Sequence, residues 1–426
     1  MKNQKARMLI IELNEFCPNY LLENSKKLNL KNIEKILSFK HTYTFTHEKK
    51  EFQGLDPWVQ WVSIHNGIPF SDHGVKRLGI SSKNSTNQIW NNLSASKKIS
   101  WLTIGVMNSR LGNKEGCISY FPDPWSSDEK AYPKELNNLL ELPRYVSKNY
   151  LSLNYVQLIK KSLKTAKFFL RKRNLNLSRK MLIKLLQSLF SPGINIHTLT
   201  TLLDYLLVLY FCREKSKKNP GLSIIFLNHI AHLQHHFWVK SPDIHPQMKH
   251  GLKICDEIIE KLLESKYDDK EKVLVINALK QKRSDEKGIQ VYRQINPEIV
   301  LDKLNICDVK IEQNMTNDGT LTFKNESSAD KAYDTLSKCR LNTGENLFFV
   351  ERITKLKIFM QLDINHTIEK DAKIISHKKF IPFYELFSNL KRTGSHVPEG
   401  DIFSTNIEIP DTIENHEIYK YIYDSF

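Results

Sequence analysis

Residues 222–238, LSIIFLNHIAHLQHHFW, join a short apolar run to a group of four histidines. The run LSIIFL is typical of a strand that is buried on both faces of a parallel sheet. Polar residues follow it at once, so the histidines are predicted directly after a strand end. In doubly wound sheets, ligands bind at the carboxyl ends of the strands. This stretch therefore indicates both a fold class and the place of a site.

Three more segments have the same character, namely MLIIEL, ISWLTIGV and KVLVINAL. Helix-like segments such as NIEKILSF and WVQWVSIHNGI lie between them. Strands that alternate with helices predict an α/β fold with a doubly wound, mostly parallel sheet. The predicted strands are Met8–Leu13, Trp101–Val106, Leu222–Leu227 and Val273–Ile276.

Two segments interrupt this pattern. Residues 133–220 are helical and basic in character, and residues 308–363 have the β-β-α-β-β order of a small α+β cap. The core is then expected in three parts, at 1–132, 221–307 and 364–426. We expect the cap to form a separate unit over the carboxyl edge of the sheet, where it would act as a lid and shape substrate access.

The charge balance favours a polyanionic partner. The 426 residues include 63 Lys and Arg against 47 Asp and Glu, a net charge of +16. Such an excess suits a phosphorylated substrate, an anionic membrane surface or glycan, or nucleic acid. No nucleic-acid-binding motif is present, so nucleic acid is the least favoured partner. In the basic insertion, cations alternate with apolar residues, which predicts either an amphipathic binding face or a solvated scaffold; the cations are Lys160, Lys161, Lys164, Lys167, Arg171, Lys172 and Arg173.

The chain is expected to be a soluble cytoplasmic protein, free or peripheral to the inner face of the membrane. The six cysteines form no CxxC pair, and the N-terminus has no apolar core of signal-peptide length. The longest apolar run, LTTLLDYLLVLYFC, is interrupted by Asp204 and is shorter than the roughly 20 residues of a membrane span.

The histidine group and the first strand end supply candidate ligands. On a helix, His232 shares a face with His235 or with His236. Neutral imidazoles on one face suit zinc or manganese, or acid–base chemistry near neutral pH. The alternative is that some of them pack in the core. Oxygen donors follow the first strand at Glu12, Asn14 and Glu15, although Glu15 could equally cap the next helix.

The motifs occur in an order that resembles the alkaline phosphatase superfamily, in its type I phosphodiesterase and nucleotide pyrophosphatase branch. NGIPFSDHGV follows the first strand and loop, AHLQHHFW follows a later strand, and GSHVPEG lies near the C-terminus. The resemblance implies two metals, usually zinc, and a Thr or Ser nucleophile that attacks phosphate esters. The likeness covers most of the chain apart from the basic insertion.

Several of the family's functional positions are changed here. NEFCP replaces the usual DGxxP, so the first aspartate falls on Asn14, and the nucleophile falls on Pro57, which has no hydroxyl. In the DxxxH element, the aspartate falls on Ala231 and the histidine on His235. The SDHG element falls around Asn277 and Ala278, and the last histidine on His396. A standard two-zinc mechanism is not expected, because two neighbouring metals need carboxylates that offset their charge.

The resemblance leaves a site with a single divalent metal, zinc or manganese, or a site without metal. We predict that His235 and His396 converge on it and that His232, Glu12 or Asn14 completes it. Asp56 is the nearest substitute for the nucleophile, as nucleophile or base, and Gln60, His229 and His236 are assigned to substrate binding. The expected function is a phosphoester or phosphodiester hydrolase or transferase with a phosphorylated or otherwise anionic substrate. The alternative is a non-catalytic homologue that binds an anionic ligand, a glycan or a membrane surface.

Overall fold

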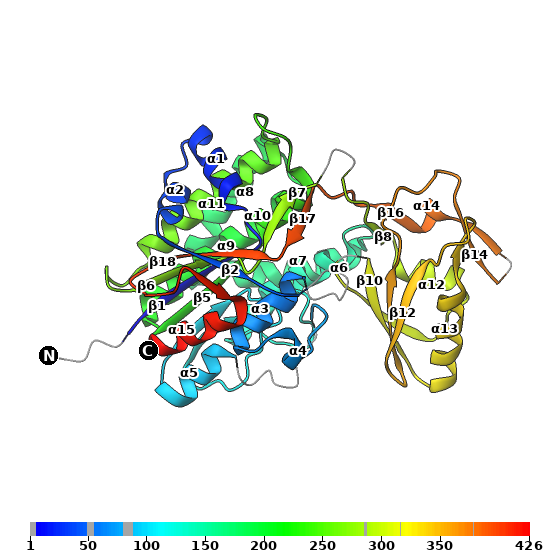
Figure 1. Ribbon diagram of the computed structural model, residues 1–426, viewed down its shortest axis with the longest axis horizontal. Helices are drawn as coiled ribbons and strands as arrows, with labels where there is room; N and C mark the ends of the chain where they lie inside the picture. Colours follow the sequence, from blue (N-terminus) through cyan, green and yellow to red (C-terminus); the bar gives the residue numbers. More distant parts are fainter. Residues whose placement is uncertain (1–5, 49–54, 80–87, 285–287, 316, 378) are drawn as a thin grey trace. The chain divides into compact units, whose positions relative to one another are not determined.

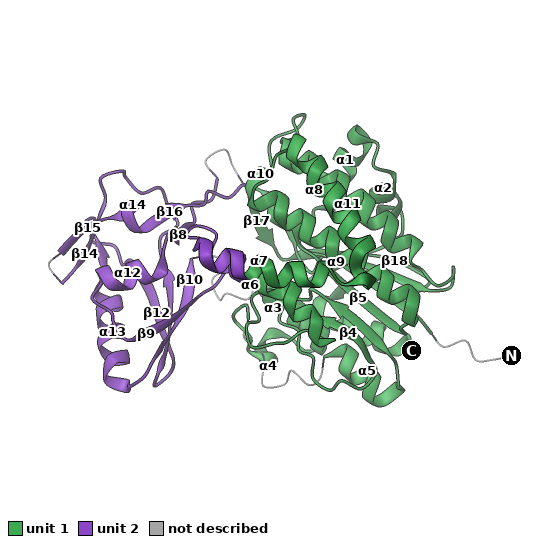
Figure 2. Ribbon diagram, turned by 180° about the vertical axis from the view of Figure 1, so that it is seen from behind, with its two compact units in different colours: residues 1–143, 161–283, 394–426 green, residues 144–160, 284–393 purple. Residues whose placement is uncertain are grey.

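The computed structural model describes residues 6–48, 55–79, 88–284, 288–315, 317–377 and 379–426. The chain forms two compact units, shown in Figure 2. Unit 1 contains residues 1–143, 161–283 and 394–426, and unit 2 contains residues 144–160 and 284–393.

Unit 1 is built on an eight-stranded sheet with the order β19-β2-β18-β6-β1-β5-β3-β4. Neighbouring strands are parallel except at β18, which is antiparallel to both β2 and β6. The bounds are β1 Met8–Leu13, β2 Lys40–Phe45, β3 Trp101–Ile104, β4 Cys117–Phe121, β5 Leu222–Leu227, β6 Lys272–Ile276, β18 Glu399–Thr405 and β19 Thr412–Glu414. The predicted α/β fold with a mostly parallel sheet is confirmed, and β3 alone ends earlier than predicted.

Helices cover both faces of this sheet (Figure 1). On one face lie α1 Pro18–Leu28, α2 Lys31–Leu37, α9 Ile196–Lys218, α10 His229–Phe237 and α11 Pro246–Glu264. On the other lie α3 Pro57–Asn66, α5 Ile89–Lys97 and α15 Ile418–Asp424. Side chains alternate along β1, so Leu9, Ile11 and Leu13 join the first layer while Glu12 meets α3.

The basic segment between β4 and β5 is helical, as predicted. It contains α6 Asn137–Asn149, α7 Tyr155–Phe169, α8 Leu175–Phe190 and the long helix α9. Helix α9 is the longest apolar element, and it is packed between β3–β5 and α11. Among the described helices, none combines the length and apolarity that crossing a bilayer requires.

Unit 2 has its own apolar core around a four-stranded antiparallel sheet with the order β12-β13-β10-β9. Its elements include β9 Val309–Gln313, β10 Asp318–Phe323, α13 Glu326–Lys338, β12 Phe348–Thr354 and β13 Lys357–Leu362. This is the β-β-α-β-β order that the sequence predicts. The same unit holds α12 Pro297–Lys303, α14 Phe383–Leu386, and the strands β8 Tyr292–Gln294, β11 Arg340–Leu341, β14 Lys373–Ser376, β15 Lys379–Pro382 and β16 Phe387–Asn389. The role of this unit as a lid, and the division of the chain at 133–220 and 308–363, stay predictions.

Candidate metal centre

The centre begins at the carboxyl ends of β1 and β6. Glu15 and Ala278 lie just beyond these strands with φ of 51° and 58°, in the left-handed region. Residues other than glycine seldom adopt this conformation, and those that do cluster at functional sites. Glu15 stands where the usual DGxxP motif has glycine, which has no Cβ to strain. Its amide donates to the carbonyl of Asn277 at 3.1 Å, so the neighbouring strand end holds the turn that directs the Glu15 carboxylate.

Two histidines from distant segments meet this carboxylate. His235 lies near the end of α10, and His396 lies on β17 (Gly394–Val397), which pairs with β7 (Lys280–Arg283). The Nε2 atoms of His235 and His396 each lie 3.0 Å from Oε2 of Glu15. The two ring centroids are 5.3 Å apart. The predicted convergence of these two imidazoles is therefore present in the structure.

Backbone carbonyls orient both imidazoles. Nδ1 of His235 lies 3.1 Å from the carbonyl oxygen of Gly394, and Nδ1 of His396 lies 3.2 Å from that of Leu55. A carbonyl only accepts, so each Nδ1 carries the hydrogen and each Nε2 faces Glu15. Metal-bound histidines are commonly held in this way by a partner on the other ring nitrogen.

Amide groups hold the Glu15 carboxylate. Asn14 Nδ2 donates to Oε1 at 2.9 Å, and Gln281 Nε2 donates to Oε2 at 2.6 Å. Burial on its own would raise the pKa of the Glu15 carboxyl, but His396 and His235 hold it well below its usual range. Burial would likewise lower the pKa of His396, but Glu15 and Asp56 raise it to about 10. The centre therefore keeps a carboxylate beside a protonated imidazole at neutral pH when no metal is bound.

The residues present fit one metal ion. One ligand atom each from Glu15, His235 and His396 lies within 4.8 Å of the other two. Nε2 of His396 is buried, and its 3.0 Å contact with Oε2 of Glu15 is an ion-pair contact without hydrogen-bond geometry. Two imidazole nitrogens and one carboxylate oxygen form the three-ligand set of a catalytic zinc site that keeps an open position.

A second metal does not fit beside the first. The family's positions for it fall on Asn14, Pro57, Asn277 and Ala278, none of which carries a charge. Both asparagines use their amide groups in hydrogen bonds: Asn14 Oδ1 accepts from Trp61 Nε1 at 2.8 Å, and Asn277 Oδ1 accepts from the Asp401 amide at 2.7 Å. Asn14 thereby connects the end of β1 to α3, and Asn277 connects the end of β6 to β18.

Asp56 is the predicted catalytic residue that the structure places at the centre. It directly precedes α3, and its Oδ1 lies 3.5 Å from Nδ1 of His396. Its side chain is 26% exposed, whereas that of Glu15 is 4% exposed. Asp56 is therefore the more exposed of the two carboxylates.

Other predicted residues lie elsewhere, each for a local reason. Glu12 points to the face of the sheet that α3 covers, where its carboxylate accepts a 2.6 Å hydrogen bond from Nε2 of His65. Gln60 is buried and accepts from Nδ2 of Asn415. His229 is buried, and its Nδ1 lies 2.8 Å from Asp204. Glu12 therefore lies outside the ligand set of Glu15, His235 and His396. Gln60 and His229 are buried and do not lie on the exposed side of the centre.

His232 and His236 lie on another side of α10, next to His197 of α9. Nδ1 of His197 is 2.8 Å from Nε2 of His232. Burial and the neighbouring His245 lower the pKa of His197. The sequence prediction that His232 completes the His235–His396 set does not match this position, because His232 lies against His197 and His236 whereas His235 lies against Glu15.

The sequence prediction named Glu15 as an oxygen donor or a helix cap without assigning it to the ligand set, and it did not name His197. A carboxylate at the glycine position of DGxxP was the available signal for Glu15. His197 carried no signal, since its partners lie on a different helix.

Comparison of the sequence with family models gave no match, and comparison with curated proteins gave none. Solved structures similar to this chain include murine ectonucleotide pyrophosphatase/phosphodiesterase 5 in complex with AMP, at 11% identity and a TM-score of 0.43, covering 99% of this chain and 94% of that one. Phosphonoacetate hydrolase from Sinorhizobium meliloti, in complex with phosphonoformate, is similar at 9% identity and a TM-score of 0.44, covering 99% and 96%. These proteins have folds of the alkaline phosphatase superfamily, and identity this low concerns the fold alone.

Proposed function

We propose that this chain is a phosphoester or phosphodiester hydrolase or transferase that works with one divalent metal ion, zinc or manganese. The observation that carries the proposal is the convergence of Glu15, His235 and His396 on one point, with ligand atoms within 4.8 Å of one another. When bound, the metal would polarise a phosphoryl oxygen or lower the pKa of a bound water. The surplus of cationic residues, a net charge of +16, favours a phosphorylated substrate.

Asp56 is the residue that we assign to the chemical step. It lies against His396 and next to Pro57, the position on which the family's nucleophile falls. As a nucleophile, its oxygen would form a bond to phosphorus while the leaving-group oxygen departs with its electron pair, and water would then release the phosphoryl group. As a base, it would instead accept the proton of an attacking water or alcohol. Glu15 is held by two amides and two imidazoles, so its role is to bind the metal.

The test is metal content together with turnover of a chromogenic phosphodiester and a phosphomonoester by the full chain. We expect stoichiometric metal in the purified protein, loss of turnover on chelation, and recovery with zinc or manganese. Compared with the wild type, His235→Ala and His396→Ala should each lose turnover and one equivalent of metal, whereas His366→Ala, a half-exposed histidine of unit 2, should lose neither. Stoichiometric metal without turnover of either ester would contradict the enzymatic proposal, and absence of metal would contradict the centre.

We also propose that α8 docks on an anionic phospholipid bilayer from the cytoplasmic side. One face of α8 exposes large apolar side chains, and Phe190 at its end is 91% exposed; the others are Leu175, Leu182, Ile183, Leu185, Leu186 and Leu189. Solvent-exposed apolar surface of this kind marks an interaction site. All six cysteines are described and are free thiols, which suits a reducing compartment.

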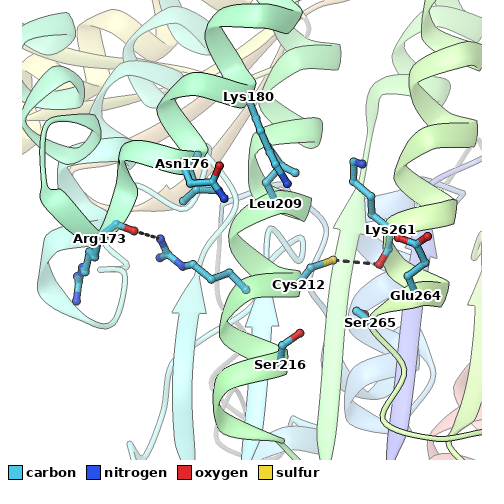
Figure 3. Close-up of a pocket in the computed structure, with 11 residues that line it drawn as sticks. Arg173, Asn176, Lys180, Leu209, Cys212, Ser216, Lys261, Glu264 and Ser265 are labelled. Carbon is cyan, nitrogen blue, oxygen red and sulfur yellow. Dashed lines mark hydrogen bonds between the residues drawn. The ribbon is translucent and has the colours of Figure 1, made fainter.

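A basic hollow beside α8 supports lipid as the partner. It has a volume of about 320 Å³ and lies between α8, α9 and α11 (Figure 3). Four of its lining residues are cationic and one is acidic: Arg173, Lys180, Arg213, Lys261 and Glu264. Apolar side chains with cations beside them suit acyl chains and a phosphate headgroup together, whereas a glycan would offer the apolar face little.

A further inference from the structure

Three imidazoles from two helices meet outside the centre described above. His232 and His236 lie one turn apart on α10, and His197 is the second residue of α9. One ring nitrogen of each lies within 4.8 Å of those of the other two. The ring centroids of His197 and His232 are 4.9 Å apart, those of His197 and His236 are 5.1 Å apart, and those of His232 and His236 are 4.9 Å apart.

We infer that His197, His232 and His236 form a second metal site that takes a late first-row divalent cation such as zinc. Three imidazole nitrogens that converge are the ligand set that zinc, nickel and copper prefer. A set of three histidines leaves a fourth position for water or an exogenous ligand. All three residues are partly exposed, so an ion can reach them from solvent.

The backbone around these histidines is held in place by caps. The side chain of Asn195 accepts from the amides of His197 and Thr198, at 3.0 Å each, which fixes the first turn of α9. Asp204, also on α9, accepts from the amides of Asn228 and His229 at 2.7 and 2.8 Å, which fixes the start of α10. The two helices that supply the ligands are thus already joined at one point, and little ordering is left for metal binding to impose.

The second site is separate from the first but shares a helix with it. His235 leaves α10 toward Glu15, while His232 and His236 leave it toward His197. A metal at the second site would clamp α10 to α9 and so stabilise the helix that carries His235. Its occupancy should therefore raise the thermal stability of the protein.

The experiment uses the full chain with His235→Ala and His396→Ala combined, which removes the first centre. After stripping and dialysis, zinc is titrated by calorimetry, and cobalt by its visible absorption. We expect this background to bind one equivalent of either ion and to gain thermal stability from zinc. Adding His232→Ala should abolish both effects, and adding His366→Ala should abolish neither.

A second variant, whose side chain is closer in shape to histidine, separates the loss of a ligand from misfolding. His236→Gln keeps the size of the side chain near that of histidine, and circular dichroism shows whether α9 and α10 remain folded. With the fold kept, we expect zinc affinity to fall at least tenfold. Lack of zinc binding in the His235→Ala/His396→Ala background, or full zinc binding after His232→Ala is added, would overturn the second site. Neither result bears on the first centre, which is measured in His232→Ala alone.

Discussion

Nε2 of His396 lies 3.0 Å from Oε2 of Glu15, which joins the C-terminal part of the chain to the turn after its first strand. A neutral imidazole with its hydrogen on Nδ1 would direct a lone pair at the carboxylate and repel it. Either a proton or a metal ion between the two groups removes this repulsion. A metal ion and a proton therefore compete for the position between His396 and Glu15. The negative charge of Glu15 favours the binding of either one.

Glu15→Gln should remove that charge while keeping the size of the side chain. We expect the affinity of the centre for zinc to fall at least about 10–100-fold, the loss seen when even outer partners of a metal site are removed. The measurement is competition with a chromophoric chelator. Glu23→Gln, at an exposed carboxylate paired with Lys27, is the matched control and should leave the affinity unchanged. Equal affinities in the two variants would exclude Glu15 as a ligand.

Metal binding should release a proton from His396. Glu15 and Asp56 raise the pKa of this residue to about 10, so the metal-free protein carries the proton at neutral pH. The apparent affinity should therefore rise with pH up to about that value. Calorimetry in buffers of different ionisation enthalpy counts the protons released per metal. The number of protons released should fall as pH rises through about 10, and a release that stays constant across this range would assign the proton to another group.

The stability of the metal-free protein should depend on pH in two opposite ways. The raised pKa of His396 contributes stability that is complete below about 6.5, its unfolded value, and is lost as pH rises through about 10. The depressed pKa of Glu15 contributes stability that is present above about 4.3 and is lost as pH falls through its folded value. The melting temperature should thus decline above neutral pH, and this decline should be smaller in His396→Gln.

Strands β1, β3, β5 and β6 could be predicted from sequence because each is a short apolar run, and β1, β3 and β5 are buried throughout. His235 and His396 could be predicted because each belongs to a motif placed after a strand. For Glu15 the sequence left a ligand and a helix cap as alternatives, because its direction depends on a left-handed backbone that the carbonyl of Asn277, just after β6, holds in place. Glu12 was predicted as a possible ligand because it stands at the end of the first strand, but alternation along β1 turns it toward His65. Local sequence patterns predict the strands, whereas contacts between strand ends determine which side chains meet as ligands.

Glu12 and His65 form a buried pair whose loss should affect stability and leave the metal centre intact. Both side chains are at most 2% exposed, and their hydrogen bond is 2.6 Å long. Glu12→Ala should lower the free energy of unfolding by about 3–5 kcal/mol, the usual cost of removing one partner of a buried pair. Chemical denaturation measures this change. The folded variant should bind metal as the wild type does, and weaker binding would restore Glu12 to the ligand set.

Asp56→Asn should separate chemistry from metal binding. The side chain keeps its size, but it loses the charge needed for a nucleophile or base. We expect kcat to fall by about 10²–10⁴, the usual contribution of acid–base catalysis, while metal content stays unchanged. If Asp56 only orients His396, metal affinity would fall instead and kcat of the loaded enzyme would stay close to that of the wild type. Steady-state kinetics and metal analysis of the same preparation distinguish these outcomes.

Docking on a bilayer should require both the apolar and the cationic parts of the α8 surface. Vesicles that contain phosphatidylserine should retain the protein on sedimentation, and retention should decrease as salt rises, because exposed charges are screened. Leu182→Ser/Leu186→Ser/Phe190→Ser should abolish retention, since these side chains supply the surface that would enter the interface. The matched control is Ile299→Ser/Phe349→Ser/Phe380→Ser, which removes three exposed apolar residues of unit 2. Equal loss in both variants would indicate a general effect of surface hydrophobicity. Retention on phosphatidylcholine vesicles at all salt concentrations would mean that the cations of the basic hollow play no part in docking. The protein would then bind a neutral membrane surface as well as an anionic one.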